Sequence, residues 1–418
     1  MIRFTALCLV LATAASAEDA LPVLTWEACV AEARAGNSAL REAGLGLDAA
    51  RARRNAAYGG FLPRVNASLG ASDSDRNNRL WYRDLNSSWS ARLSASQSLF
   101  SGFSTLADVL RSSASTRREE AAFRQTAADL RARLRRAFVD VVYGQENVTV
   151  QEGIAQRRRA NADLVRLKYE AGRENKGSAL RAEADALQAA YEVARARRAL
   201  ILSRQKLARE LGRDAFTEFR VQPDWTMAPP PPSPDLAAVA EATPAAASAA
   251  ASVDEAHASL MAARAPFYPA LDASASLGRD GADWFPDEGR SWSAGLSVSW
   301  SLFNGGRDWF AWRASRAVAA ESESSLASVR RDQRVSLQEA LFYYVDTHEA
   351  LAVRDRYLEA ARTRAEIGRA QYANGLLGFV QWDLIEGDLV DAERSSIAAR
   401  RDGLYAEAGW RRALGEGL

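Results

Sequence analysis

The sequence predicts a membrane protein of the α+β class that is built from two copies of one unit. Three observations lead to this prediction. The second half of the chain repeats the first at a constant offset of 203 residues. Each half contains two segments in which apolar and polar residues alternate, which is typical of β-strands. Each half also contains a long stretch without proline, which breaks helix interiors, and this favours a very long helix.

The composition argues against two classes of protein. The 418 residues carry 54 Lys and Arg against 53 Asp and Glu, a net charge of +1. This balance gives no support to a nucleic-acid-binding protein, which would carry a basic excess. The mean hydropathy of −0.27 argues against several apolar membrane helices. Proline is absent from residues 64–222 and 287–418.

The first 17 residues predict an export signal. Arg3 precedes a short apolar stretch, and Ala15-Ser16-Ala17 then forms a small-residue cleavage pattern. The stretch is shorter than the about 20 residues that a membrane-spanning helix needs. We therefore expect residues 1–17 to be a secretory signal peptide.

The internal repeat sets the domain organisation. Trp89-Ser-Ala-Arg-Leu-Ser-Ala-Ser-Gln-Ser-Leu-Phe100 matches Trp292-Ser-Ala-Gly-Leu-Ser-Val-Ser-Trp-Ser-Leu-Phe303 without an insertion, and the same offset aligns Tyr169 with Tyr372 and Gly172 with Gly375. The first unit covers residues 18–222, a Pro-rich linker covers 223–235, and the second unit covers 236–418.

Each unit reads as helix, strand, loop, strand, long helix, turn and return helix. In the first unit we expect a helix at 25–58, strands at about 61–72 and 88–100 around a polar loop at 73–87, a long helix at 103–171 and a return helix at 178–212. In the second we expect an Ala-rich helix at 236–265, strands at about 267–278 and 291–303, a long helix at 307–373 and a return helix at 379–414.

The strands have the features of membrane strands. They run about 11–12 residues, which is enough to cross a bilayer at a barrel tilt. One face is apolar, and the other is mostly Ser, Gly and Asn. Aromatic residues lie near both strand ends: Phe61, Phe100, Phe267, Tyr268 and Phe303 on the helix side, and Trp81, Tyr82, Trp89, Trp284, Phe285 and Trp292 on the loop side. A half-buried sheet in a soluble protein alternates in the same way, but aromatic girdles favour a barrel.

The strand count predicts that the barrel is shared between chains. Four strands cannot close a barrel, and open edges are not tolerated in lipid. Two chains would supply 8 strands and three would supply 12, with more room for a channel. The long helices would each span about 100 Å at 1.5 Å per residue, and their apolar residues recur at the three- and four-residue spacing of coiled coils.

Taken together, these segments resemble the TolC-like outer-membrane efflux proteins. The residues that carry the resemblance are Phe61-x-Pro63, Ser98-Leu-Phe-Ser-Gly102 and Tyr169-Glu-Ala-Gly172 in the first unit, and Phe267-x-Pro269, Ser301-Leu-Phe-Asn-Gly-Gly306 and Tyr372-Ala-Asn-Gly375-Leu, followed by Glu386, in the second. Each motif is weak alone, but their order and constant offset make the match specific.

The resemblance implies a homotrimer with a 12-stranded outer-membrane barrel and a periplasmic tunnel of helices. Such a channel passively conducts drugs, small toxic compounds, metals or secreted proteins from an inner-membrane pump and a periplasmic adaptor to the outside. The turns would form the periplasmic tip where the adaptor docks, at Tyr169, Gly172, Tyr372, Gly375 and Leu376. No cofactor or metal is implied.

The tip departs from the family pattern in one respect. Family members often carry an acid six positions after the tip glycine, and sometimes another nine positions after it. This chain has Gln381 and Leu384 at these positions in the second unit, and Ser178 and Arg181 in the first. Acids do occur nearby, at Asp383, Glu386 and Asp388 in the second unit and at Glu183 and Asp185 in the first. We expect some of these acids to line an entrance constriction that favours cations, with Gln381, Asp383, Glu386 and Asp388 as the candidate residues. The alternative is that the acids are ordinary solvated or salt-bridged helix charges.

No catalytic motif competes with this interpretation. The two histidines, His257 and His348, lack metal-ligand spacing, and we expect the lone Cys29 of the exported chain to be a buried thiol. No nucleophile elbow or phosphate-binding loop is present, so an enzyme is not expected. Two alternatives to a channel remain: a periplasmic structural coiled-coil protein without a channel, and a periplasmic binding module.

Overall fold

The computed structural model describes residues 21–77, 83–281, 284 and 289–418. The predicted signal peptide and the girdle residues Trp81, Tyr82 and Phe285 lie outside the described residues. The chain divides into two compact units. We call them the hairpin unit (residues 1–41, 126–236 and 336–418) and the sheet unit (residues 42–125 and 237–335). Each unit takes segments from both sequence repeats.

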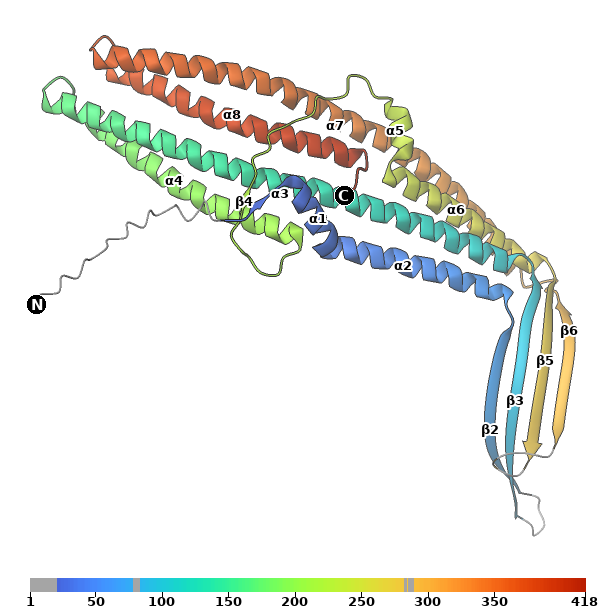
Figure 1. The fold of residues 1–418 in the computed structure, drawn as a ribbon. Coiled ribbons are helices and arrows are strands. Elements are labelled where there is room, and N and C mark those ends of the chain that lie inside the picture. The colour runs from blue at the N-terminus through green and yellow to red at the C-terminus, as the bar shows by residue number, and fades with distance from the viewer. Residues whose placement is uncertain (1–20, 78–82, 282–283, 285–288) are drawn as a thin grey trace, which may run out of the picture. The chain divides into compact units, whose positions relative to one another are not determined.

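The elements follow the predicted order in both repeats (Figure 1). The first repeat contains β1 (Val23–Leu24), α1 (Trp26–Gly36), α2 (Ser38–Tyr58), a 3-10 turn (Gly59–Phe61), β2 (Arg64–Asn77), β3 (Arg83–Ser101), α3 (Ser104–Glu170), α4 (Lys176–Leu211) and β4 (Arg220–Val221). The second contains α5 (Leu236–Ala242), α6 (Pro244–Arg264), a 3-10 turn (Ala265–Phe267), β5 (Ala270–Gly281), β6 (Arg290–Ser299), α7 (Arg307–Ala373) and α8 (Phe379–Ala413).

The sheet unit contains one antiparallel four-stranded sheet in the order β2-β3-β5-β6. The register places Ala67, Leu93, Leu277 and Trp292 in one row across the four strands, and the alternating residues between the rows are mainly serine and glycine. The apolar residues therefore share one face, and most of them are exposed within the single chain. The outer edges of β2 and β6 have no partner strand among the described residues.

The strand boundaries differ from the predicted ones at both ends. Residues 73–77 and 83–87 were expected in a loop, but they continue the β2–β3 ladder, because backbone hydrogen bonds do not require apolar side chains. Phe61 and Phe267 lie in 3-10 turns instead of strands. β6 ends at Ser299, four residues before the predicted end, opposite the first residue of its partner β5.

Two helices that were predicted to be continuous are broken. The helix expected at 25–58 ends at Gly36 and restarts at Ser38. The helix expected at 236–265 is broken at Thr243, whose side chain caps α6 by accepting a hydrogen bond from the Ala246 N–H, with Pro244 in the first turn.

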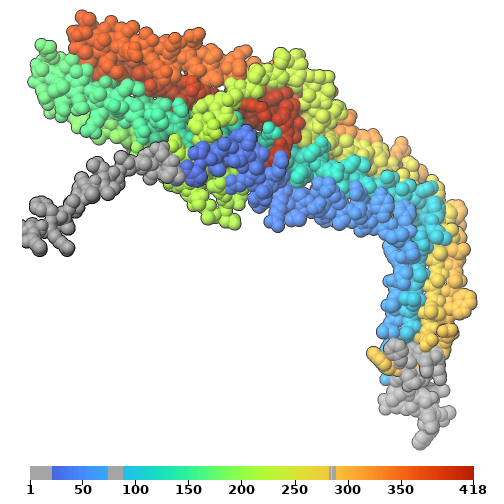
Figure 2. Space-filling view, in the orientation of Figure 1, coloured from blue at the N-terminus to red at the C-terminus, as the bar shows by residue number. Residues whose placement is uncertain are grey.

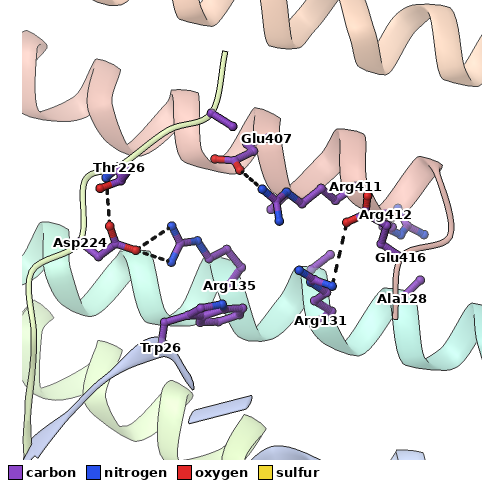
Figure 3. Close-up of a pocket in the computed structure, with 13 residues that line it drawn as sticks. Trp26, Ala128, Arg131, Arg135, Asp224, Thr226, Glu407, Arg411, Arg412 and Glu416 are labelled. Carbon is purple, nitrogen blue, oxygen red and sulfur yellow. Dashed lines mark hydrogen bonds and ion pairs between the residues drawn. The ribbon is translucent and has the colours of Figure 1, made fainter. Parts of the chain in front are cut away.

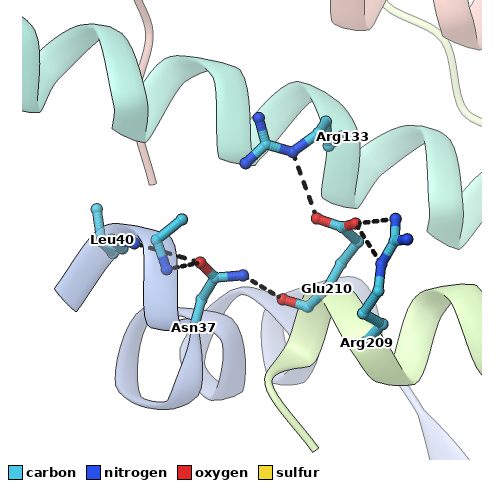
Figure 4. A network of polar contacts seen from close by, with 6 residues as sticks. Asn37, Leu40, Arg133, Arg209 and Glu210 are labelled. Atoms are coloured by element: carbon cyan, nitrogen blue, oxygen red, sulfur yellow. Dashed lines mark hydrogen bonds and ion pairs between the residues drawn. The ribbon is translucent and has the colours of Figure 1, made fainter. Parts of the chain in front are cut away.

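Asn37 explains the first break (Figure 4). Its side-chain oxygen accepts hydrogen bonds from the Ala39 and Leu40 N–H groups, and its side-chain nitrogen donates to the Glu210 carbonyl at 2.9 Å. The Glu210 carboxylate also lies 3.4 Å from Arg133 and 2.7 Å from Arg209. Asn37 therefore caps α2 and fastens the break to the end of α4.

The core of the hairpin unit forms where α1, α3 and α4 meet beside the small parallel β1–β4 pair. Phe138 and Leu207 are fully buried there, and Cys29 is buried with them, as predicted. Burial and the neighbouring Glu32 raise the pKa of the Cys29 thiol to about 12. The thiol is thus a packing group.

The described helices differ in length and apolar content, the two properties that a membrane-spanning helix requires. None of them meets these criteria alone, whereas the bent pair Leu236–Ala242 and Pro244–Phe267 meets them together.

Candidate functional site

The predicted tip residues lie at the two helical turns of the hairpin unit, which sit side by side (Figures 1 and 2). Both turns use the same backbone motif. Gly172 (φ 70°) and Gly375 (φ 77°) adopt the left-handed conformation that favours glycine. The Arg173 N–H donates to the Lys168 carbonyl at 2.8 Å, and the Leu376 N–H donates to the Gln371 carbonyl at 2.9 Å. These bonds end α3 and α7 as equivalent Schellman motifs.

The two turns differ in what their side chains contact. Tyr372 is 2% exposed, whereas its repeat equivalent Tyr169 is 41% exposed. The Tyr372 ring stacks on Trp382 with the ring centroids 4.2 Å apart and the planes at 8°. Leu376, at the apex of the second turn, is 78% exposed. The second turn therefore holds a buried aromatic pair beneath an exposed apolar residue.

The aromatic pair joins the two hairpins. Tyr372 and Trp382 form a buried cluster with Val165 of α3 and Ala182 of α4. Lys168 of α3 donates to the Tyr372 carbonyl, and its ammonium lies 4.0 Å from the centre of the Tyr372 ring.

The Tyr372 hydroxyl adds a polar contact to this junction. It donates to Glu174 at 3.1 Å. Burial and the Glu174 carboxylate raise the pKa of Tyr372 far above its usual range. Tyr372 therefore remains a hydrogen-bond donor at any physiological pH.

The predicted constriction residues are not gathered on one face of α8. Asp383 lies 2.7 Å from Arg158 of α3, and Glu386 is 1% exposed and lies 2.9 Å from Arg369 of α7. Asp388 is exposed and pairs with Arg364 of α7 at 2.9 Å. Gln381 is exposed. All three acids thus have an arginine partner within the chain.

Arg158 is the centre of a charge cluster between the hairpins. It lies 3.7 Å from Asp185 in addition to Asp383, and Arg181 lies 3.3 Å from Asp185 and 4.0 Å from Asp383. Asp383 therefore shares two arginines with Asp185, which belongs to the other repeat.

The sequence pattern did not single out Lys168, Glu174 or Trp382, and the basic cluster Arg157-Arg158-Arg159 reads in the sequence as a solvated helix face, whereas Arg158 is largely buried between carboxylates. Only Trp382 gave a usable signal, because the 203-residue offset aligns this bulky residue with Ala179. The repeat comparison therefore marks a position where the second hairpin is specialised.

A second polar site fastens the linker to the helices (Figure 3). A cavity of about 270 Å³ lies between α1, α3, α8 and the linker. The Arg135 guanidinium lies 3.1 Å from Asp224 and 5.0 Å from the centre of the Trp26 ring. Burial opposes ionisation of Asp224, but the Thr226 N–H and Arg135 outweigh it, so the pKa of Asp224 is lowered. The linker is thus held to α3 by an ionised carboxylate.

Further along the linker, the Ala228 carbonyl accepts a hydrogen bond from the Tyr344 hydroxyl of α7. The linker therefore contacts helices of both repeats. Among the residues that the structure describes, no group of three or more His, Cys, Asp or Glu side chains is placed to hold a metal ion.

The geometry defines a class of protein: a duplicated chain with an open, one-sided apolar sheet, very long helical hairpins and a pair of equivalent turns. The family model of the outer membrane efflux proteins matches residues 29–213 and 237–416. The chain belongs to this family, which confirms the resemblance drawn from the motifs.

Solved structures show the same fold. The outer-membrane channel OprN has 23% identity and a TM-score of 0.82, with 94% of this chain and 90% of that chain covered. The open-state MtrE outer membrane channel of Neisseria gonorrhoeae has 19% identity and a TM-score of 0.83, with coverages of 93% and 88%.

The outer membrane protein VceC of Vibrio cholerae has 17% identity and a TM-score of 0.81, with coverages of 94% and 96%. Comparison with curated protein sequences finds no significant match. The predicted fold class, a membrane α+β chain that contributes strands to a barrel and long helices to a tunnel, is confirmed by the family and these structures. The chain is an outer-membrane efflux channel.

Proposed function

We propose that the protein is the exit channel of a tripartite export system and that three copies close a 12-stranded barrel. The observation that carries the proposal is the open four-stranded sheet, whose apolar face is exposed and whose β2 and β6 edges are unpaired in the described chain. Lipid does not tolerate open edges, so other copies must pair with them. Three copies leave a lumen wide enough for a channel.

The long helices support a conduit that extends away from the membrane. α3 and α7 each have 67 residues, or about 100 Å at 1.5 Å per residue. We place them in the periplasm, with the two turns facing an inner-membrane pump. Substrates such as drugs, small toxic compounds, metals or secreted proteins would pass through without energy supplied by this chain.

Measurements of the oligomeric state and of the channel conductance test this function directly. We expect heat-resistant trimers in the outer-membrane fraction, and single-channel conductance after reconstitution into planar bilayers. A periplasmic structural coiled-coil protein would give neither result. Recovery of the purified protein in soluble form without detergent would rule out the channel.

We propose that the two turns dock the periplasmic adaptor. Leu376 supports this proposal because it is exposed at the apex of a turn that Tyr372 and Gly375 hold in place, and Tyr169 and Gly172 supply the second turn. Site-specific cross-linking from Leu376 should capture the adaptor. Cross-links that form equally well from a cysteine on the mid-helix surface of α4 would contradict specific docking at the turns.

We further propose that the acids after the second turn bias the channel entrance toward cations. Their arginine partners reduce the charge that they present, so we expect a modest effect. Conductance of the Asp383→Asn/Glu386→Gln variant in planar bilayers measures it, with Gln381→Ala as an uncharged control and Asp388→Asn as the exposed acid. Unchanged cation selectivity in the acidic variants would leave the acids with a structural role only.

A further inference from the structure

Two arginines face each other on the apolar side of the sheet. Arg279 of β5 and Arg290 of β6 are directly opposite in the antiparallel register, one row beyond the Leu277–Trp292 pair. Strand residues two apart point to the same face, so both arginines lie on the face that carries the apolar residues. Like charges directly opposite each other destabilise a sheet, so this pair requires an explanation.

The pair lies at the outer margin of the apolar face. Nine residue-to-residue steps lead from Ala270, where β5 begins, to Arg279. At about 3.3 Å per residue and a tilt of about 40°, they rise about 23 Å along the membrane normal. The apolar band of a membrane barrel is about 25 Å tall, so the arginines reach the headgroups of the leaflet opposite the helices.

Aromatic residues mark the same level. Trp292 is on the neighbouring inner row and is 76% exposed. Trp89 lies on the next outer row, and its ring packs edge-on against Trp284 with the centroids 4.7 Å apart. Tryptophan gathers at membrane interfaces, which agrees with the calculated height.

Neither guanidinium has an ion pair or hydrogen bond to a side chain in the part of the chain that the structure describes, and both are exposed. By contrast, the arginines at the tip, such as Arg158 and Arg369, contact carboxylates. Among the described residues, the two positive charges on the apolar face therefore have no carboxylate partner.

We propose that Arg279 and Arg290 bind a phosphate group of an anionic lipid in the outer leaflet. Arginine buries its carbon stem along apolar surface while its charged head reaches the interface. Its planar guanidinium matches phosphate oxygens in a bidentate geometry. Two adjacent guanidinium groups suit a phosphate monoester, which carries up to two negative charges. This inference rests on the outer-membrane placement of the proposed function.

A second copy of the chain offers a competing counterion. Asp73 lies on the same apolar face of the edge strand β2, opposite Ser87. If the β2 of one copy pairs with the β6 of the next, Asp73 could approach Arg290. The test therefore has to separate a lipid site from a contact between subunits.

The chain supplies a matched control for the test. Arg92 of β3 lies opposite Gly278, one position before Arg279, and therefore points to the polar face at nearly the same height. Changing Arg92 to Gln removes one positive charge at nearly the same height without changing the apolar face.

The test measures binding of fluorescent diphosphoryl lipid A to the purified full chain in dodecylmaltoside micelles. We expect Arg279→Gln/Arg290→Gln to weaken binding at least about tenfold, and Arg92→Gln to change it less than about twofold. Monophosphoryl lipid A should bind more weakly than the diphosphoryl form. Millimolar inorganic phosphate should not displace the lipid.

Several results would overturn the lipid site. These are equal binding by the double variant and the unaltered protein, an equal loss in Arg92→Gln, and displacement of the lipid by inorganic phosphate. Asp73→Asn adds a further arm. Loss of oligomer heat resistance in both Asp73→Asn and the double variant, with lipid affinity unchanged, would assign the arginines to a subunit contact. Trimer formation and conductance are measured separately, so their failure would reject the channel and not the lipid contact.

Discussion

Tyr372 and Tyr169 allow one substitution to be compared in two copies of the same turn. Both residues precede a left-handed glycine by three positions, but only Tyr372 is buried. We expect Tyr372→Ala to open the tip locally, because it removes the stack on Trp382, the cation–π contact with Lys168 and the hydrogen bond to Glu174.

The burial of Tyr372 determines how much free energy the Tyr372→Ala substitution costs. Truncation of a fully buried aromatic side chain to alanine costs about 3–5 kcal/mol. Each 1.4 kcal/mol is a factor of about ten, so the opening equilibrium should rise by about two to three and a half orders of magnitude. Tyr169→Ala should cost less than about 1 kcal/mol, because a side chain that is 41% exposed loses few contacts.

Amide hydrogen exchange measures this local opening. Peptides that cover residues 160–182 and 366–390 should exchange faster in Tyr372→Ala, and should change little in Tyr169→Ala. Tyr372→Phe keeps the stack and should lie between the unaltered protein and Tyr372→Ala. Equal loss of protection in the two alanine variants would refute the argument, since it would show that burial of the second tyrosine does not hold the tip together.

Three further predictions concern the rest of the chain. Cys29 should resist thiol reagents at pH 8 in the folded protein and react in urea, because burial raises its pKa to about 12; rapid labelling of the native protein would contradict this. The hydrogen bond from Arg213 is the largest cause that lowers the pKa of Glu32, against partial desolvation. The Glu32–Arg213 contact therefore stabilises the folded protein above the unfolded pKa of about 4.3, and this stabilisation is lost as the pH falls through the lower pKa of folded Glu32. Acid unfolding curves of Glu32→Gln should show a weaker pH dependence than those of the unaltered protein. Superimposable curves would exclude this contribution. Gly102→Ala should lower the melting temperature more than Gly305→Ala. Both glycines have similar φ values, 60° and 57°, but a Cβ at Gly102 would lie 2.4 Å from a carbonyl oxygen, whereas a Cβ at Gly305 would meet nothing within 4 Å. Equal shifts in melting temperature would show that the clash at Gly102 relaxes.

The long helices and the sheet were predictable because their signals are periodic and local. The predicted limits of the long helix at 307–373 agree with α7, since proline-free coiled-coil spacing continues up to a glycine turn. The break at Asn37 was not predictable in this way. Its cap is completed by the Glu210 carbonyl, which lies 173 residues further along the chain, and no local pattern contains that partner.

The same distinction applies to the candidate site. The glycine turns could be located because Gly172 and Gly375 recur at the repeat offset. The pairing of Asp383 with Arg158 could not be located, because it joins α8 to α3 across 225 residues. The sequence shows where the acidic residues are, whereas the packing of the hairpins determines which of them are paired with an arginine.

The boundaries of the two compact units do not coincide with the boundary between the two sequence repeats. The sequence repeat is the unit of duplication, but each compact unit takes segments from both repeats. The sheet also joins the two repeats, because β3 of the first repeat pairs with β5 of the second. Neither half of the sequence therefore contains a complete copy of either compact unit, so we expect a half-length chain to need a second copy to complete its core.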